Sequence, residues 1–343
     1  MSCMVLSVCE WFQGCKTLCF VVYFEKKELI YMGTGEDRDM KQGSGTKRKR
    51  LLFVYNPKAG KGTVTKHLHE IVDIFVKAKY LVTVYPTQKR GDACKLMQSK
   101  EAERYHLIVC SGGDGTLREV VDGLLRGGKD VPLGYIPTGS TNDFARSLGL
   151  SEDILKAAKN IAKGEVFSCD SGKFNGKNFV YIAAFGLFTD VSYATNQQFK
   201  NIFGHAAYIL QGAKSLSSIK SYHVEVEHDG ETLRGDYIYG MVTNSLSVGG
   251  FKNITGKNVS FDDGKFEVML VRRPATLAEM KDIVLSLLRQ TFDAACITTF
   301  KSSYIKVKSK ETLDWTLDGE YGGSYTEAEI ENVQKAVPII VKK

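Results

Sequence analysis

Three glycine-rich segments of the chain combine a compliant backbone with groups that could bind phosphate. They are Asn56-Pro-Lys-Ala-Gly-Lys-Gly62, Ser111-Gly-Gly-Asp-Gly-Thr116 and Pro137-Thr-Gly-Ser-Thr-Asn-Asp-Phe-Ala-Arg146. Glycine lets the backbone approach phosphate oxygens closely, and the N–H groups at the start of a helix attract anions. None of the segments has the GxxxxGK[ST] spacing of a Walker A loop. Together they predict a crevice suited to a polyphosphate.

Carboxylates accompany these segments. Asp114 would repel phosphate unless it acted through a divalent cation or its water shell, and Asp143 could bind a metal ion or cap a helix. Near the end of the chain, Asp318-Gly-Glu320 is followed by Gly322-Gly323. A hairpin turn would explain the Asp-Gly pair alone, but it does not require the glutamate or the second glycine pair. A carboxylate in such a turn could act as a general base.

The elements around the three loops alternate between strands and helices. Strands are predicted over residues 51–55, 80–86, 106–110 and 131–136, and helices over 64–79, 91–104 and 117–125. Each glycine-rich loop follows a strand, so helix N-termini are expected at the same edge of the sheet. The pattern predicts an α/β, Rossmann-like nucleotide-binding domain with helices on both faces of its sheet.

From about Ser168 the pattern changes to β-rich runs joined by turns. Asn175-Gly176 and Asp229-Gly230 are hairpin signals, and one helix is predicted over Leu277–Arg289. We therefore expect a C-terminal antiparallel, β-sandwich-like domain, with the active site in the cleft between the two domains. The predicted limits are 47–167 plus 325–343 for the α/β domain and 168–324 for the mainly β domain. Spacing alone does not decide which domain the tail at 337–341 joins.

Residues 1–46 are predicted to be a leader and linker outside the fold. The apolar run Cys19–Phe24 is too short to span a membrane, and it has neither a preceding basic segment nor a following small-residue cleavage site. We interpret Met40, or less favourably Met32, as the true translational start. The alternative is a genuine, poorly ordered extension.

Charge and cysteine content restrict the class of protein. Residues 1–39 carry 4 Lys/Arg and 6 Asp/Glu, so the remaining 42 basic and 33 acidic residues give +9, against +7 for the whole chain. Such a basic body favours binding to polyanions or to an anionic membrane surface, or it serves solubility.

The cysteines form no CxxC pair, so we expect no disulfide framework and a cytoplasmic location. Lys47-Arg-Lys-Arg50 is the only basic cluster and lacks an aromatic stacking motif, so nucleic acid is not an expected partner.

The order of the motifs resembles that of diacylglycerol kinases. The matching segments are Asn56-Pro-x-x-Gly60, Gly112-Gly-Asp-Gly-Thr116 with Glu119, Pro137-Thr-Gly-Ser-Thr-Asn-Asp-Phe144 and Asp318-Gly-Glu-Tyr-Gly-Gly323. The resemblance is greatest to the soluble bacterial type, within the superfamily that includes sphingosine kinases, and it covers about residues 47–343. The Gly-Gly-Asp-Gly motif also occurs in NAD kinases and phosphofructokinases, whereas the third and fourth segments are far more discriminating.

The resemblance implies an ATP- and Mg²⁺-dependent lipid kinase that converts diacylglycerol to phosphatidic acid. It implies that Asp318, aided by Glu320, activates the lipid hydroxyl. It also implies an acidic network around the catalytic magnesium, which comprises Asp114, Asp143 and Asp170. The other residues that it implies for the ATP site are Asn56, Pro57, Lys58, Ala59, Gly60, Thr87, Gly113, Gly115, Thr116, Leu117, Arg118, Glu119 and Ser140.

A separate, structural magnesium ion is implied at Ser260-Phe-Asp-Asp-Gly-Lys265, with the Asp263 carboxylate and the carbonyl oxygens of Ser260 and Lys265 as ligands. From the residues alone, an Asp-Gly hairpin without metal explains this segment equally well. The expected partner is a lipid at an anionic membrane surface, to which the enzyme would bind peripherally. Association into a homodimer is a further possibility that the sequence leaves undecided. The alternatives are the same chemistry on a sphingoid base, ceramide or phosphatidylglycerol, or a non-catalytic nucleotide- or lipid-binding regulator.

Overall fold

A computed structural model of the chain describes residues 5–7, 20–23, 29–32, 48–187, 219–248, 251–252, 259–289 and 291–343. The chain divides into two compact units. Unit 1 comprises Met1–Gly139, Leu150–Phe167 and Pro338–Lys343, and unit 2 comprises Ser140–Gly149 and Ser168–Val337. Among the described residues, no helix is both long and apolar enough to span a lipid bilayer.

The sheet of unit 1 has a parallel centre in the order β5–β4–β6–β7, and the end of β18 runs parallel to β7 through Ile339 and Leu133. Its strands are β4 (Lys49–Tyr55), β5 (Tyr80–Pro86), β6 (Leu107–Gly112) and β7 (Leu133–Pro137). The chain leaves β4 for β5 on one side and returns to β6 on the other. The carboxyl ends of β4 and β6 therefore flank the topological switch point, where open α/β sheets bind ligands.

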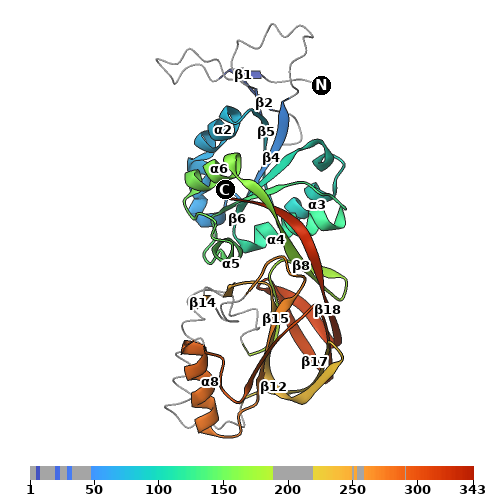
Figure 1. The fold of residues 1–343 in the computed structure, drawn as a ribbon. Coiled ribbons are helices and arrows are strands. Elements are labelled where there is room, and N and C mark those ends of the chain that lie inside the picture. Colours follow the sequence, from blue (N-terminus) through green and yellow to red (C-terminus); the bar gives the residue numbers. More distant parts are fainter. Residues whose placement is uncertain are drawn as a thin grey trace. The chain divides into compact units, whose positions relative to one another are not determined.

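Helices cover both faces of this sheet: Figure 1 shows α2 and α6 on one side, and α3 and α4 on the other. Side chains alternate along β4, so Leu51 and Phe53 pack in one core cluster with Ile71 and Phe75 of α2 and Ile161 of α6. The helical elements of unit 1 are η2 (Ala59–Gly62), α1 (Thr63–Lys66), α2 (Leu68–Lys77), α3 (Asp92–Gln98), η3 (Ala102–Arg104), α4 (Asp114–Arg126) and α6 (Ile154–Lys163). The alternation predicted from the sequence is confirmed, with the helix predicted over 64–79 divided at His67.

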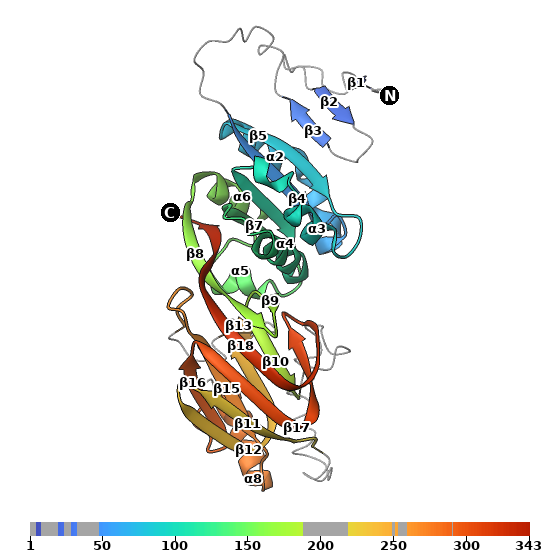
Figure 2. The same ribbon diagram turned by 90° about the vertical axis from the view of Figure 1, so that its right-hand side faces the viewer.

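Three short strands are described before residue 48: β1 (Val5–Ser7), β2 (Phe20–Tyr23) and β3 (Leu29–Met32) (Figure 2). They pair antiparallel in chain order, and β3 pairs with the edge strand β5. Part of the segment expected to lie outside the fold thus extends the sheet of unit 1. Met40 and the predicted linker after β3 fall outside the described residues, so the translational start at Met40 stays a prediction.

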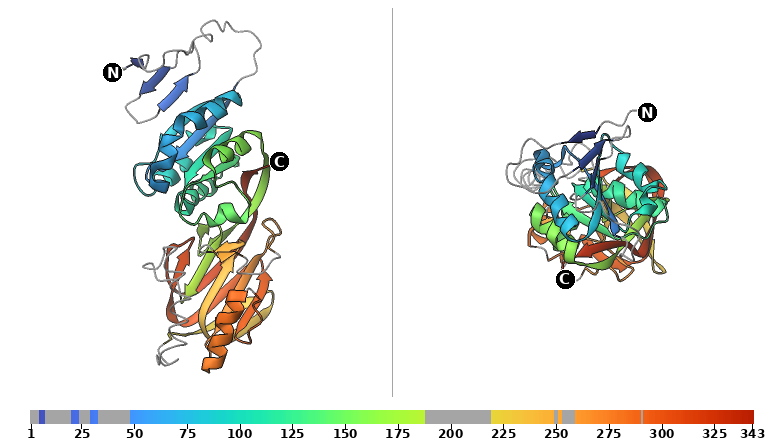
Figure 3. Two further views of the ribbon diagram at one scale, coloured as in Figure 1. Left: turned by 90° about the vertical axis from the view of Figure 1, so that its left-hand side faces the viewer. Right: turned by 90° about the horizontal axis from the view of Figure 1, so that it is seen from above.

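Unit 2 consists mainly of antiparallel strands (Figure 3). Its strands are β8 (Glu165–Phe174), β9 (Lys177–Phe179), β10 (Ile182–Gly186), β11 (Tyr222–His228), β12 (Glu231–Thr243), β13 (Ser247–Val248), β14 (Phe251–Lys252), β15 (Phe266–Arg272), β16 (Ile297–Ser302), β17 (Tyr304–Leu317) and β18 (Glu320–Val341). Its helices are α5 (Asp143–Ser147) and α8 (Leu277–Arg289). The helix predicted over Leu277–Arg289 is confirmed.

The long strands β12 and β17 each pair with β11 along one part and with β10 along another. In the pairing of β12 with β15 the register shifts between Tyr237 and Tyr239, and in the pairing of β17 with β18 it shifts between Lys308 and Leu313. Both shifts fall where the strand changes from β11 to β10 as its other neighbour. A bulge bends a strand and increases its twist, so each shift allows the strand to reach its second partner. The bent strands enclose a common core, as expected for the β-sandwich-like second domain.

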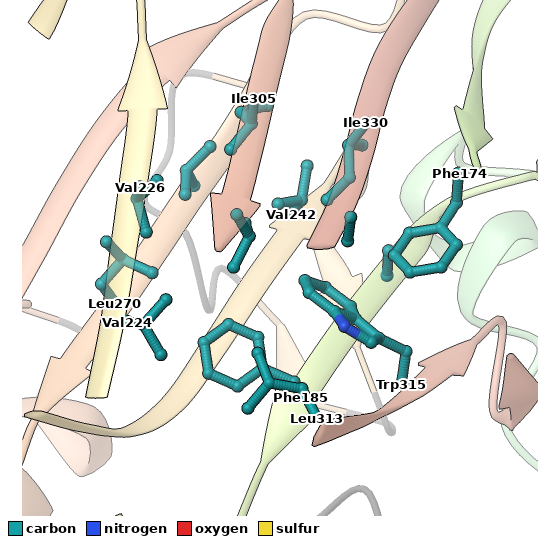
Figure 4. Close-up of a cluster of buried hydrophobic side chains, with 14 of the residues drawn as sticks. Phe174, Phe185, Val224, Val226, Val242, Leu270, Ile305, Leu313, Trp315 and Ile330 are labelled. Carbon is teal, nitrogen blue, oxygen red and sulfur yellow. The ribbon is translucent and has the colours of Figure 1, made fainter. Parts of the chain in front are cut away.

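Aromatic residues fill the centre of this core (Figure 4). The indole of Trp315 lies with its ring centroid 4.8 Å from that of Phe174 and 4.9 Å from that of Phe185. Val224 and Ile330 belong to the same buried cluster. Since these five residues come from β17, β8, β10, β11 and β18, the core joins strands that are far apart in the sequence.

The hairpin signals read from the sequence are confirmed. Asn175 and Gly176 have φ values of +44° and +77°, and Asp229 and Gly230 have +45° and +84°. Two consecutive residues with positive φ are characteristic of the type I′ turn, whose twist matches that of the paired strands. The chain re-enters unit 1 only at Pro338, later than the predicted 325, because the first part of β18 pairs with β17 as far as Glu331.

Candidate functional site

The three glycine-rich loops meet at the carboxyl edge of the unit 1 sheet. The backbone N–H of Asn56 donates to the carbonyl oxygen of Ser111 at 2.9 Å, and its side-chain amide donates to Thr116 Oγ1 at 3.5 Å. The N–H of Thr138 donates to the carbonyl oxygen of Gly112 at 2.8 Å. The loops after β4, β6 and β7 are therefore hydrogen-bonded to one another, as their positions in the sequence predicted.

The close approach of these loops explains why two of their positions are occupied by glycine. A Cβ atom on Gly60, which has φ +56°, would lie 2.6 Å from the carbonyl oxygen of Thr138. A Cβ atom on Gly113 would lie 3.2 Å from the Cα atom of Gly139. The sequence motif suggested that these glycines admit phosphate. The structure shows that they also let the loops pack against each other.

The loop after β4 is ordered by its own side chain, because the N–H of Lys58 donates to Asn56 Oδ1 at 3.0 Å. This Asx turn leads into η2. Lys58 and Gly60 are exposed, whereas Asn56, Pro57 and Ala59 are half-buried. Thr87 lies at the end of the neighbouring strand β5, and its N–H donates to the carbonyl oxygen of Tyr55 at 2.9 Å.

The helix α4 begins directly after β6 with a half-buried first turn formed by Asp114, Gly115 and Thr116. A carboxylate in the first turn is favourable for the helix dipole, so Asp114 has a structural role available besides metal binding. Leu117 is buried in the core, and its N–H already donates to the carbonyl oxygen of Gly113. Of the predicted nucleotide residues in this turn, Leu117 therefore offers no exposed side chain to a ligand.

Glu119, on the next turn of α4, accepts a hydrogen bond of 2.7 Å from the N–H of Gly91. Gly91 is the N-cap of α3, so this bond ties the start of α3 to α4. Arg118 is half-buried on the same helix. A nucleotide-binding role for Glu119 stays a prediction, and the contact that the structure gives it is with the protein backbone.

Asp318 occupies the turn between β17 and β18 in unit 2. Its side chain is 4% exposed and accepts three backbone hydrogen bonds: Oδ2 from Val180 at 2.8 Å, and Oδ1 from Tyr181 at 2.9 Å and Ile182 at 3.2 Å. Three N–H donors stabilise the ionised carboxylate. Its φ of +51° and that of Gly319, +79°, form the same type I′ pattern as the other two hairpins. The Asp-Gly pair is thus a hairpin turn and a buried carboxylate site together, and the half-buried Glu320 begins β18.

Asp143 belongs to a buried network of hydroxyl groups in unit 2. Ser247 Oγ donates to Asp143 Oδ1 at 2.7 Å, Ser147 Oγ donates to the carbonyl oxygen of Asp143 at 2.8 Å, and the hydroxyls of Ser147 and Ser245 lie 2.7 Å apart. The sequence analysis missed these serines; the only signal for Ser245 and Ser247 is the polar segment that follows the apolar run of β12. Ser140, at the start of the segment that leads to Asp143, is exposed.

Asp170 holds three segments of unit 2 together. Its buried carboxylate accepts the N–H of Gly264 at 2.7 Å and that of Lys335 at 2.8 Å. These bonds join β8 to the segment before β15 and to β18. The predicted role of Asp170 in a magnesium network is not tested by these contacts, but they give its two oxygens a structural function.

The pKa of Asp170 is raised above its ordinary value because burial disfavours the charged carboxylate, although the two N–H donors oppose the shift. A carboxyl group with a raised folded-state pKa contributes stability that is complete below its unfolded pKa and is lost as pH rises through the folded pKa. We expect the unfolding free energy of the wild type, relative to Asp170→Asn, to fall as pH rises from about 4 toward neutrality. Urea unfolding at a series of pH values measures this difference. A difference that stays constant or grows with pH would contradict it.

The Asp263 carboxylate, predicted to bind a structural magnesium ion, has protein partners in the structure. Asp263 Oδ1 accepts the N–H of Lys265 at 3.0 Å, and Oδ2 lies 3.4 Å from the ammonium group of Lys301. The Asp263 carboxylate thus faces a lysine where the family resemblance implied a divalent cation.

Comparisons with known proteins cover both units. Residues 50–174 match the family model of the diacylglycerol kinase catalytic domain, and residues 182–341 match that of the YegS C-terminal NAD kinase beta sandwich-like domain. The diacylglycerol kinase of Bacillus subtilis (strain 168) is 36% identical over 297 residues, which cover 86% of this chain and 97% of that protein. The diacylglycerol kinase of Staphylococcus carnosus (strain TM300) is 36% identical over 279 residues, which cover 80% and 90%.

Solved structures agree with these relatives. A crystal structure described as a diacylglycerol kinase from Bacillus anthracis str. Sterne aligns with a TM-score of 0.67 at 27% identity, covering 87% of this chain and 98% of that chain. A second structure from the same strain aligns with a TM-score of 0.74 at 28% identity, covering 88% and 98%. The motif order, the fold of each unit and the relatives agree, and the chain belongs to the diacylglycerol kinase family.

Proposed function

We propose that the protein is an ATP- and Mg²⁺-dependent kinase that phosphorylates the free hydroxyl of diacylglycerol to give phosphatidic acid. The observation that carries the proposal is the convergence of three glycine-rich loops at the switch point of the unit 1 sheet. Loops of this kind bind phosphates through backbone N–H groups and the positive end of a helix dipole. The names of the relatives supply the acceptor, diacylglycerol.

In unit 1, the loop from Asn56 to Gly60 and the start of α4 after Gly113 would bind the phosphates of ATP. The exposed ammonium group of Lys58 adds a positive charge beside them. If Mg²⁺ binds there, it would neutralise charge on the transferred phosphoryl group, and Asp114 is the carboxylate of this unit that would hold it. The residues of the chain thereby orient the nucleotide and reduce the repulsion between its γ-phosphate and an incoming oxygen.

In unit 2, Asp318 would orient the lipid hydroxyl and accept its proton. The hydroxyl oxygen forms a bond to the γ-phosphorus while the bond from that phosphorus to the β–γ bridging oxygen breaks, so ADP leaves with the electron pair. The three N–H groups that donate to Asp318 hold its carboxylate in one orientation. Glu320 adds a second negative charge that assists the same proton transfer.

A lipid panel tests this function. Purified protein is incubated with γ-labelled ATP and mixed vesicles that contain diacylglycerol, a sphingoid base, ceramide or phosphatidylglycerol, each with Mg²⁺ and with excess EDTA. We expect label to enter phosphatidic acid only with Mg²⁺. Label in another lipid alone would change the substrate, and no labelled lipid in any vesicle would favour a non-catalytic regulator.

Sedimentation with anionic and with neutral vesicles tests the proposed peripheral location. A body with a net charge of +9 should be attracted by the surface potential of anionic lipids. We propose that the protein sediments with anionic vesicles and is released at high salt, because salt screens this attraction. Equal sedimentation with neutral vesicles would contradict the electrostatic part of the proposal. The homodimer stays a prediction.

A further inference from the structure

Lys301 lies between a buried and an exposed carboxylate in unit 2. It is on β16, directly opposite Glu267 on β15. Its ammonium nitrogen is 2.9 Å from Glu267 Oε1 and 3.4 Å from Asp263 Oδ2. The side chain of Glu267 is 6% exposed, whereas those of Lys301 and Asp263 are 37% and 32% exposed. Lys301 thus reaches from solvent toward a buried negative charge and meets Asp263 on the way.

Glu267 keeps the lysine in this place. If Lys301 turned away, a carboxylate with almost no solvent contact would lose its countercharge, which is far more costly than the loss of an exposed ion pair. The ammonium group is therefore not free to yield its position to another cation.

A divalent ion beside Asp263 would meet this fixed charge at close range. Magnesium requires a nearly octahedral set of oxygen ligands at short distances, with carboxylate oxygens directed at the ion. Here Asp263 Oδ1 accepts the N–H of Lys265, and Oδ2 faces Lys301. A second positive charge at Oδ2 would be repelled by the ammonium group, so the two cations compete for one carboxylate.

The segment around Asp263 is also held by contacts that need no metal. Gly264 donates its N–H to Asp170, and the side-chain amide of Gln334 donates to the carbonyl oxygen of Asp262 at 2.9 Å. Ser260 Oγ donates to Asp262 Oδ1 at 3.2 Å. These bonds connect the segment to β8 and β18, which is the connection that a structural ion would otherwise provide.

We propose that the Lys301 ammonium group is the resident cation at Asp263, and that it replaces the structural magnesium ion which the family resemblance implies. The segment from residue 260 to 265 is then metal-independent in this chain. Removing the charge of Lys301 leaves Asp263 and Glu267 uncompensated and creates a site that a divalent cation can occupy. The inference concerns unit 2 alone and does not depend on the substrate of the kinase.

The test measures Asp263-dependent magnesium and its effect on stability in the nucleotide-free, full-length protein. Magnesium content after dialysis is compared between the wild type and Asp263→Asn. Ions bound at other sites contribute equally to both proteins, so the difference reports the magnesium bound at Asp263. Thermal unfolding is followed with excess EDTA and with added Mg²⁺ for the wild type, Lys301→Met and Lys301→Arg. Met preserves much of the length of lysine without the charge, and Arg preserves the charge.

We expect no Asp263-dependent magnesium in the wild type. Lys301→Met should unfold several degrees lower in EDTA and recover with Mg²⁺, and this recovery should disappear in the double variant with Asp263→Asn. Lys301→Arg should stay insensitive to Mg²⁺. One equivalent of Asp263-dependent magnesium in the wild type would overturn the proposal, as would an equal Mg²⁺ response of the wild type and Lys301→Met. If Lys301→Met does not fold, the metal content of the wild type still decides.

Discussion

Asp318→Asn should lower phosphoryl transfer by between about a hundredfold and ten-thousandfold, the range for removal of a general base. The amide cannot accept the proton of the attacked hydroxyl. Binding of ATP should change little, because the loop from Asn56 to Gly60 and the start of α4, which would bind its phosphates, belong to unit 1, whereas Asp318 belongs to unit 2. Steady-state transfer to diacylglycerol and equilibrium binding of ATP measure the two effects separately.

The hydrogen bonds of Asp318 require a second measurement on this variant. Oδ1 accepts two N–H groups and Oδ2 accepts the N–H of Val180. In the asparagine variant, an NH₂ group would face at least one of these donors, and the buried group left unpaired costs about 1–3 kcal/mol. Thermal unfolding must therefore show that the variant is folded at the assay temperature before its activity is interpreted.

Asp314→Asn is the matched control for this prediction. Asp314 lies on β17, the strand that ends just before Asp318, and its exposed carboxylate accepts a hydrogen bond from the hydroxyl of Ser324. The same chemical change there should leave transfer within about twofold, since surface substitutions rarely alter stability or a distant reaction. If folded Asp318→Asn keeps the activity of Asp314→Asn, then Asp318 only caps the three N–H groups and is not the base.

Gly60→Ala should raise the dissociation constant for ATP at least about tenfold and destabilise the protein by about 1–3 kcal/mol. The new Cβ atom would lie 2.6 Å from the carbonyl oxygen of Thr138. The backbone fixes the positions of both atoms, so no rotation of a side chain can relieve the contact. The loops after β4 and β7 must then separate. Calorimetric titration with ATP and urea unfolding measure the two effects.

Gly128→Ala separates steric contact from backbone strain. Gly128 has φ +61°, close to the +56° of Gly60, but nothing lies within 4 Å of its Cβ position. This control should cost about 1 kcal/mol from its left-handed conformation and leave ATP binding unchanged. If both variants lose the same stability and bind ATP equally, the contact between Gly60 and Thr138 does not shape the nucleotide site.

Much of the fold was predictable because its signals are local. The alternation of apolar strands and helices before residue 140 predicted a sheet with helices on both faces, and the helix Leu277–Arg289 was predicted with its observed limits. The turns at Asn175-Gly176 and Asp229-Gly230 followed from the ease with which these residues adopt positive φ. Each signal depends on residues within a few positions of one another.

Other parts of the fold were not predictable from local patterns. β18 is a strand of 22 residues that pairs with β17 and, at its end, with β7. Its sequence is rich in glutamate and has few consecutive apolar residues, so its propensity alone does not indicate a strand of this length. Its hairpin with the preceding strand β17 and its pairing with β7 and β8, which are far away in the sequence, determine it instead.

The sequence by itself determined the family and the chemistry available to it, because motifs of glycine and carboxylate depend on residue type and order. Only the tertiary structure decided how individual groups are used. It assigned three backbone donors to Asp318 and the ammonium group of Lys301 to Asp263. The partners of these carboxylates are residues 38–138 positions away in the chain, and no spacing in the sequence encodes a contact that is made only when distant strands pair.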